Sequence, residues 1–101
     1  MDPTFSFSAE LWPWRTETST TWVMLTVPND ISDEIADLVP DRRGFGSIKV
    51  RARIGPSEWS SSIFPSKELG SFVLPLNKAV RKANDVESGD VVDVELDILI
   101  T

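Results

Sequence analysis

Apolar and polar residues alternate along several stretches of the chain, a pattern that indicates β-strands with one buried face. Three such stretches lie at residues 4–12, 47–54 and 91–100, and Pro13 is expected to end the first. Their inward-facing residues are expected to be Phe5, Phe7, Ala9 and Leu11 in the first, Ile48, Val50, Ala52 and Ile54 in the second, and Val92, Val94, Leu96, Ile98 and Ile100 in the third.

Three further strands are expected from shorter runs rich in apolar or β-branched residues. Residues 21–27 are almost continuously apolar or β-branched, which predicts a strand buried on both faces and closed by Pro28. Residues 58–64 and 71–74 form the other two runs. Segments rich in Gly, Pro, Ser or Thr predict the connections, which lie at 15–20, 55–57, 67–70 and 87–90.

Two short amphipathic helices complete the pattern. In the first, Asn29 or Asp30 is expected to cap the N-terminus and Pro40 to end the helix. Pro75 is expected to be the first residue of the second helix, where its missing N–H is not needed. The apolar stripes at helical spacing are Ile31, Ile35 and Leu38 in the first helix, and Leu76, Ala79, Val80 and Ala83 in the second.

About six strands and two short helices predict an all-β fold formed by one domain over residues 1–101. A chain this short with that many strands must limit its exposed sheet edges. The pattern therefore favours a closed or nearly closed β-barrel.

Six short segments, in order, resemble a known family. They are Phe7 to Trp12, Trp22 to Pro28, Arg43 to Gly46, Trp59 to Pro65, Leu74 to Arg81, and Gly89-Asp90. The set is similar to a small bacterial and archaeal domain of unknown function, which is found alone and also fused ahead of bacteriocin-protection-type domains. The resemblance implies a six-stranded split or closed barrel with two short helices, similar to the double-split barrel of AbrB-type regulators. It implies no activity and no catalytic residue.

The chain contains no His and no Cys, which excludes several kinds of chemistry. Excluded are His or Cys nucleophiles, Ser-His-Asp triads, zinc sites built on His or Cys, and disulfides. Asp30, Asp33, Glu34 and Asp37 form an acidic stripe on the first helix, but their side chains are expected to point outward and not to converge on a metal. We therefore expect no catalytic residue, no metal and no cofactor.

The net charge of −6 is unevenly distributed. Residues 46–82 carry seven basic and two acidic residues, whereas residues 1–45 and 83–101 are both acidic. Nucleic acid is therefore not an expected partner, because a net negative chain repels it at long range. The basic stripe (Lys49, Arg51, Arg53) either faces the acidic stripe (Asp93, Glu95, Asp97) on a neighbouring strand, lies free in solvent, or binds an anion.

Candidate ligand-binding residues come from the aromatic content and the basic middle of the chain: Trp22, Arg43, Trp59, Ser61, Ser62, Lys78 and Arg81. The four Trp residues either fill the core or, together with Arg81 or Lys78, line a pocket that stacks a ring and holds an anion. The run Ser60-Ser61-Ser62 has no His as a base and no Gly-x-Ser-x-Gly elbow, so small residues inside a tight barrel are the better interpretation.

We expect a non-enzymatic module that binds a small anionic ligand or a protein partner, as a monomer or a homodimer. An AbrB-like DNA-binding regulator and an enzyme that uses Ser, Lys or carboxylates are the alternatives. No apolar run approaches the roughly 20 residues of a membrane helix, and the N-terminus lacks the pattern of a signal peptide. No membrane association and a cytoplasmic location are therefore expected.

Overall fold

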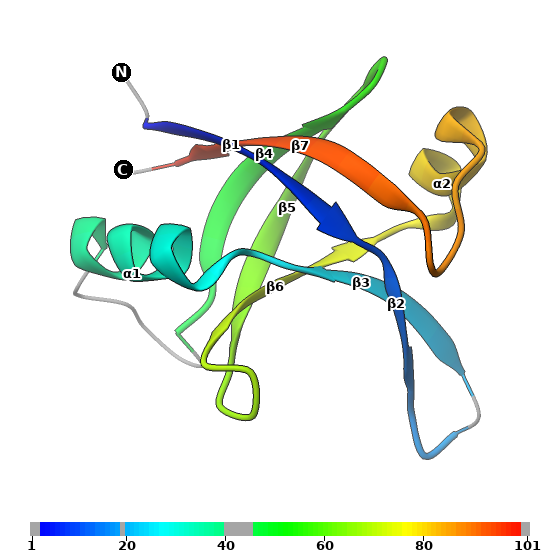
Figure 1. The fold of residues 1–101 in the computed structure, drawn as a ribbon, viewed down its shortest axis with the longest axis horizontal. Helices are drawn as coiled ribbons and strands as arrows, with labels where there is room; N and C mark the ends of the chain where they lie inside the picture. The colour runs from blue at the N-terminus through cyan, green and yellow to red at the C-terminus, as the bar shows by residue number, and fades with distance from the viewer. Residues whose placement is uncertain (1–2, 19, 40–45, 100–101) are drawn as a thin grey trace.

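The computed structural model describes residues 3–18, 20–39 and 46–99 and shows a mostly β chain with two helices (Figure 1). The strands are β1 (Thr4–Glu10), β2 (Trp12–Arg15), β3 (Thr21–Thr26), β4 (Ile48–Ile54), β5 (Ser57–Ser66), β6 (Ser71–Leu76) and β7 (Val91–Ile98), and the helices are α1 (Asn29–Leu38) and α2 (Lys78–Asn84).

The seven strands of the described residues form one curled antiparallel sheet in the order β1-β7-β4-β5-β6-β3-β2. The long strand β5 belongs to both halves of this sheet, because residues 57–63 pair with β4 and residues 64–66 pair with β6. The halves curl around a shared interior, and the result is a half-barrel with α1 and α2 at opposite sides of the view (Figure 1).

Six strands were expected, and the described residues form seven because the first predicted strand is divided. Residues 4–10 pair with β7, whereas residues 12–15 pair with β3, and only Leu11 separates the two segments. The Leu11 N–H donates to the Asp90 carbonyl at 2.8 Å, and the Leu11 carbonyl accepts from Gly89 N–H at 2.8 Å. Pro13 does not end the strand as predicted but lies inside β2, where an edge strand tolerates the missing N–H.

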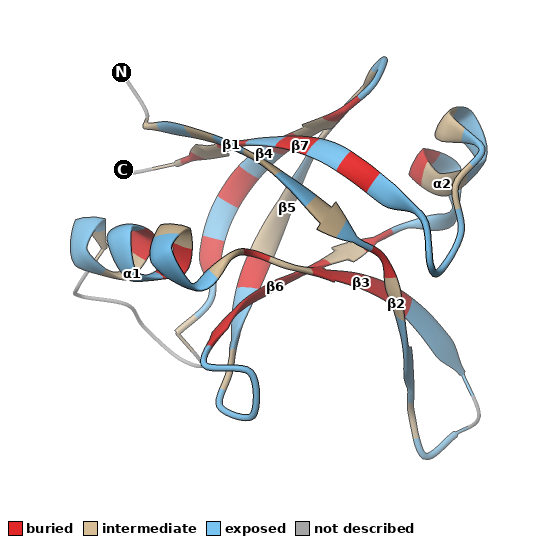
Figure 2. Cartoon of the chain, viewed as in Figure 1, coloured by how far each residue is buried: buried red, intermediate tan, exposed pale blue. Residues whose placement is uncertain are grey.

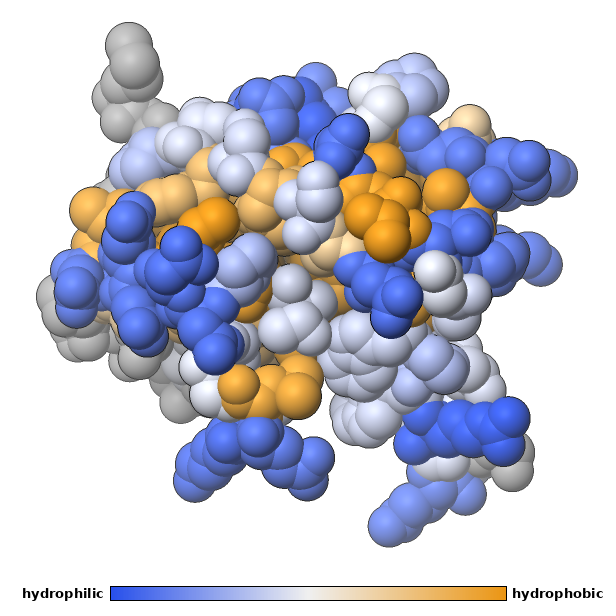
Figure 3. All heavy atoms as spheres, in the orientation of Figure 1, coloured by the Kyte–Doolittle hydropathy of each residue, from blue (hydrophilic) through white to orange (hydrophobic). Residues whose placement is uncertain are grey.

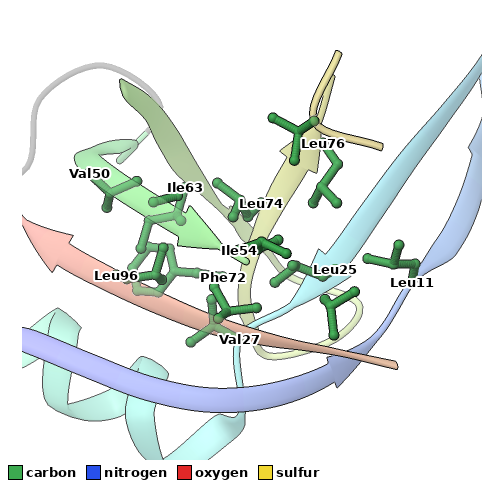
Figure 4. Close-up of a cluster of buried hydrophobic side chains, with 14 of the residues drawn as sticks. Leu11, Leu25, Val27, Val50, Ile54, Ile63, Phe72, Leu74, Leu76 and Leu96 are labelled. Carbon is green, nitrogen blue, oxygen red and sulfur yellow. The ribbon is translucent and has the colours of Figure 1, made fainter. Parts of the chain in front are cut away.

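The interior is filled by alternate residues of the strands, as the period-2 patterns predicted. In β4 and β7 every second residue is buried, and the residues between them are exposed except Arg53 and Asp97, which are half-buried (Figure 2). Leu25, Ile63, Leu74 and Leu96 are fully enclosed, and they point toward one another from both halves of the sheet (Figure 4). This layer, rather than the helices, forms the centre of the molecule.

Helix α1 packs on β6 through Ile35, which is fully buried, and through Ser32. The Ser32 hydroxyl donates to the Val27 carbonyl and accepts from the Phe72 N–H, each at 3.1 Å. The predicted side-chain cap is wrong, because Pro28 occupies the N-cap position and the side chain of Asn29 accepts from the Ser71 hydroxyl instead.

Helix α2 starts three residues later than predicted. Asn77 caps it by accepting from the Val80 N–H at 2.8 Å, and Pro75 and Leu76 belong to β6. Pro75 is tolerated in this strand because the pairing of β6 with β5 has already ended at Val73.

Other boundaries also differ. β5 continues through Pro65 to Ser66. Leu38, which was predicted to lie on the apolar stripe of the first helix, is exposed at the end of α1. The predicted roles of Pro40 and Ile100 lie outside the described residues. No helix in the described part of the chain is long and apolar enough to cross a membrane.

Candidate functional site

Strand β3 was predicted to be buried on both faces, which holds for Val23, Met24 and Leu25 but not for Trp22, which is half exposed. Val23 and Leu25 belong to the central core, whereas Met24 does not, although it is buried. Because side chains alternate along a strand, Trp22 and Met24 point to the outer face. The half of the sheet formed by β2, β3, β6 and the end of β5 is therefore apolar on both faces.

The outer face is built from cross-strand neighbours. Trp14 lies opposite Trp22, and Trp12 lies opposite Met24. On the other side of β3, Met24 lies opposite Pro75. In antiparallel pairs such opposed side chains are in contact distance, so that aromatic and apolar residues stabilise one another.

These residues line a cleft of about 710 Å³ between two hairpins. The β2–β3 hairpin forms one wall and the β5–β6 hairpin the other, and the two stand apart at the lower side of the molecule, each ending in hydrophilic atoms (Figure 3). Among the described residues, the lining is formed by Trp12, Trp14, Trp22, Met24, Phe64, Pro65, Ser66, Lys67, Glu68, Leu69, Val73 and Pro75.

Four side chains of this aromatic cleft are unusually exposed for their type. Trp14 is 52% exposed, Trp22 49%, Leu69 44% and Phe64 41%. Single exposed apolar residues are ordinary, but a contiguous group of them on one face marks an interaction site. A volume of this size also lies within the usual range of ligand clefts, roughly 300–1,000 Å³.

The cleft contains few polar groups. The Trp12 indole N–H donates to Thr26 Oγ1 at 2.9 Å, which fixes the ring against β3. The indole N–H groups of Trp14 and Trp22 have no acceptor in the part of the chain that the structure describes. Lys67 and Glu68, which are neighbours on the β5–β6 hairpin, supply one positive and one negative charge. The wall is therefore neutral overall, with two indole donors still available.

The candidate residues named from sequence do not converge on one site. Trp22 lines the aromatic cleft, whereas Trp59 packs against the central core from β5. Ser61 and Ser62 are half-buried on the same strand, opposite Val50 and Lys49 of β4. Arg43 lies outside the described residues.

The two candidate cations of α2 lie away from the cleft lining. Lys78 is exposed at the first residue of the helix. Arg81 is half-buried, and its Nη1 lies 3.5 Å from Glu87 Oε2, while its buried Nε has no hydrogen-bond partner among the described residues. The proposed combination of a Trp ring with Arg81 or Lys78 is therefore not assembled at this cleft, where Lys67 is the lining cation.

Arg51 and Arg53 of the basic stripe of β4 face the acidic stripe of β7, as one of the sequence interpretations predicted, whereas Lys49 lies beside Leu99. The strands pair so that Arg51 lies opposite Asp97 and Arg53 opposite Glu95. Arg53 binds Asp97 with two hydrogen bonds of 2.8 and 3.0 Å, and its Nε lies 3.5 Å from Glu95 Oε1. Arg51 Nε lies 3.7 Å from Glu58 Oε1 on β5.

This pairing changes the protonation of Asp97. Hydrogen bonds from Arg53 and then from the Thr4 hydroxyl, which donates at 2.7 Å, lower the pKa of Asp97 from 3.8 to about 2. The same contact raises the pKa of Arg53 above its usual value, chiefly through the hydrogen bond to Asp97. The charged groups of Arg53 and Asp97 are thus engaged within the chain and serve the structure.

Two further clefts are smaller than the aromatic cleft. One of about 470 Å³ lies beside the charged residues of β4 and β7 and includes Arg53, Asp93 and Glu95 in its wall. The other, of about 190 Å³, lies between α1 and the β5–β6 hairpin. The carboxylates of α1 are exposed, and no three acidic side chains gather around a common point within residues 3–18, 20–39 and 46–99.

Sequence reasoning found the Trp residues but missed Met24, Phe64 and Leu69 as their neighbours. The available signal was the spacing of Trp22 and Met24, which places both on the face opposite Val23 and Leu25. What the sequence could not supply is the pairing of β3 with β2 and β6.

Comparison with known proteins identifies the family of the chain. A search of curated proteins finds no match for it. A family model described as Domain of unknown function (DUF1905) matches residues 7–96, which span β1 to β7 and include all the residues that line the aromatic cleft. The chain therefore belongs to the DUF1905 family.

Proposed function

We propose that this protein is a non-enzymatic interaction module, which binds a protein partner through the aromatic cleft. The observation that carries the proposal is the outer sheet face, where Trp14 and Trp22 lie opposite each other and are half exposed. Rigid aromatic residues lose little conformational freedom on binding, and they dominate the energetics of interfaces.

The composition of the cleft matches the centre of a protein interface. Such centres are enriched in Trp, Phe and Met and depleted in charge, and the cleft combines three Trp residues with Met24 and Phe64. Trp12 is held in place by its hydrogen bond to Thr26, and Met24 is buried beneath the exposed rings. This support keeps the binding face rigid before a partner arrives, which lowers the entropic cost of association.

A small anionic ligand is the weaker occupant. Lys67 is the lining cation, and its neighbour Glu68 lines the same wall, so the cleft offers no excess of positive charge. The DNA-binding alternative depends on a basic surface from residues 46–82, but two of its cations, Arg51 and Arg53, already lie against Glu58, Glu95 and Asp97. Catalysis through the Ser run would need a base beside Ser61, and the three clefts described above do not include Ser61 in their walls.

We also propose that the half-barrel is an AbrB-like barrel in which β1 and β2 act as one interrupted strand. They are consecutive in the chain and stand at the two ends of the sheet order. Hydrogen bonds of Leu11 to Gly89 and Asp90 brace the junction. Hydrogen exchange tests this proposal. The amides of β1 and β2 should exchange with the same free energy of opening, and separate opening of the two strands would contradict it.

The binding proposal is tested with a random peptide library displayed on phage. Peptides are selected on the wild-type protein and then measured on Trp22→Ser, Trp14→Ser and Leu38→Ser, each checked for folding by circular dichroism. Leu38 is the control because it is exposed to a similar degree on α1, away from the cleft. We expect binding to fall at least about 30-fold for the Trp variants and to stay unchanged for Leu38→Ser. Selected peptides that bind all variants equally would contradict the proposal.

A further inference from the structure

We infer that the partner seated in the aromatic cleft is a second copy of this chain, in a two-fold homodimer. This inference rests on the function proposed above and names its partner. Each copy inserts the tip of its β5–β6 hairpin, which carries Leu69, into the cleft of the other. Leu69 is 44% exposed at this tip and lines the same cleft as three Trp residues.

The charges of the hairpin are self-complementary. Lys67 and Glu68 are adjacent in sequence, and both line the cleft. In a two-fold dimer the same patch meets itself, and residue i of one copy contacts residue j of the other while j contacts i. Lys67 of each copy can then face Glu68 of the other copy. Two ion pairs form in this way, because each copy supplies one cation and one anion. A patch with one sign of charge would repel its own copy.

The apolar area is sufficient for a modest dimer. Aromatic side chains bury about 150–250 Å² each, so Trp14, Trp22 and Phe64, which are between 41% and 52% exposed, contribute roughly 300 Å² per copy. Leu69, Pro65, Lys67 and Glu68 are also exposed and extend this patch. A standard interface needs about 800 Å² per partner, and weaker dimers need less.

The backbone of the edge strand β2 also favours association through the side chains of the outer face. β2 stands at the end of the sheet order and is an edge strand. Pro13 lies within this strand and brings no N–H, so the edge offers an incomplete row of donors for pairing with another strand. The exposed side chains of the face, rather than the backbone of the edge, are therefore the surface available to a second copy.

Sedimentation velocity tests the inference, on protein from about 5 to 500 µM at physiological ionic strength, where screening over about 8 Å limits repulsion from the net charge. We expect the wild-type chain to shift from 11.3 kDa toward twice that mass as concentration rises. Leu69→Ser and Trp22→Ser should raise the dissociation constant at least about 30-fold, and Leu38→Ser should leave it unchanged.

Charge exchange distinguishes the two-fold contact from general stickiness. Lys67→Glu and Glu68→Lys should each weaken self-association about 10-fold, because each leaves like charges facing one another. The double variant, with both substitutions in one chain, should regain the wild-type dissociation constant to within about threefold. A double variant that stays as weak as the single ones would overturn the inference.

The outcomes separate this inference from the proposed function. A single species of 11.3 kDa at every concentration overturns the homodimer. If selected peptides still bind the wild type and lose Trp22→Ser, the aromatic cleft remains an interaction site with another partner. If peptides and self-association both ignore the Trp and Leu69 substitutions, both proposals fall.

Discussion

The contact between Arg53 and Asp97 provides the sharpest prediction about stability. Asp97→Asn keeps the size of the side chain but removes the charge that accepts two hydrogen bonds from Arg53 and one from Thr4. The Asp97 side chain is only 17% exposed, so the pair lies between a surface ion pair and a buried one. We expect a loss of about 1 kcal/mol in the free energy of unfolding at neutral pH.

The pH dependence of this loss follows from the direction of the pKa shift. The pKa of Asp97 is lowered by folding from 3.8 to about 2. The unfolded chain therefore takes up this proton at higher pH than the folded chain, and the stabilisation is fully present above about pH 4. As the pH falls through about 2, the folded carboxylate is protonated as well, and the contribution disappears.

Thermal unfolding of both proteins at about pH 7 and about pH 2.5 is the assay. At neutral pH the variant should melt about 4–8 °C below the wild type, the shift that 1 kcal/mol gives in a domain of this size. The difference should shrink near pH 2.5. Glu34→Gln, which removes an exposed carboxylate of α1, should change the melting temperature by far less. A difference that is the same at both pH values, or matched by Glu34→Gln, would refute the reasoning.

Three further substitutions test the structural account by urea unfolding. Ser32→Ala removes the buried hydroxyl that bonds to the Val27 carbonyl, and should cost about 1–2 kcal/mol. Asn77→Ala removes the cap of α2 and should cost about 1 kcal/mol. Gly55→Ala should cost about 1–2 kcal/mol, because Gly55 has a φ of +54° and a Cβ there would lie 2.3 Å from Asn84 Oδ1. Changes below about 0.5 kcal/mol in all three would contradict these contacts.

Local patterns predicted the strands that have one buried and one exposed face. The bounds of β4 and β7 were predicted to within two residues. That Arg51 and Arg53 lie opposite Asp97 and Glu95 followed from the equal spacing of opposite charges on the two strands. The core followed from the same alternation, since Val50, Ile54 and Leu96 occupy the inward positions.

The failures arose where pairing at long range overrides a local signal. Pro13 and Pro75 were predicted to end or begin an element, yet both lie inside strands at places where the neighbouring strand requires no N–H. The division of the first strand at Leu11 depends on two different partners, β7 and β3. A sequence read segment by segment does not contain that information.

The candidate site failed to be predicted for the same reason. The aromatic cleft is assembled from four strands, and Trp22 meets Trp14 and Phe64 only after β3 has paired with β2 and β6, and β6 with β5. The number of Trp residues was a usable signal, but it did not distinguish Trp59 in the core from Trp22 in the cleft.

The most direct test of the central claim is ¹⁹F NMR of the protein labelled with 5-fluorotryptophan, followed through a dilution series and then a titration with a selected peptide. Trp14 and Trp22 report on the aromatic cleft, and Trp59 is an internal control that packs against the core. We expect saturable shifts of the Trp14 and Trp22 resonances in one or both series, with Trp59 unchanged. Fixed Trp14 and Trp22 resonances in both series, or a shift largest at Trp59, would contradict that claim.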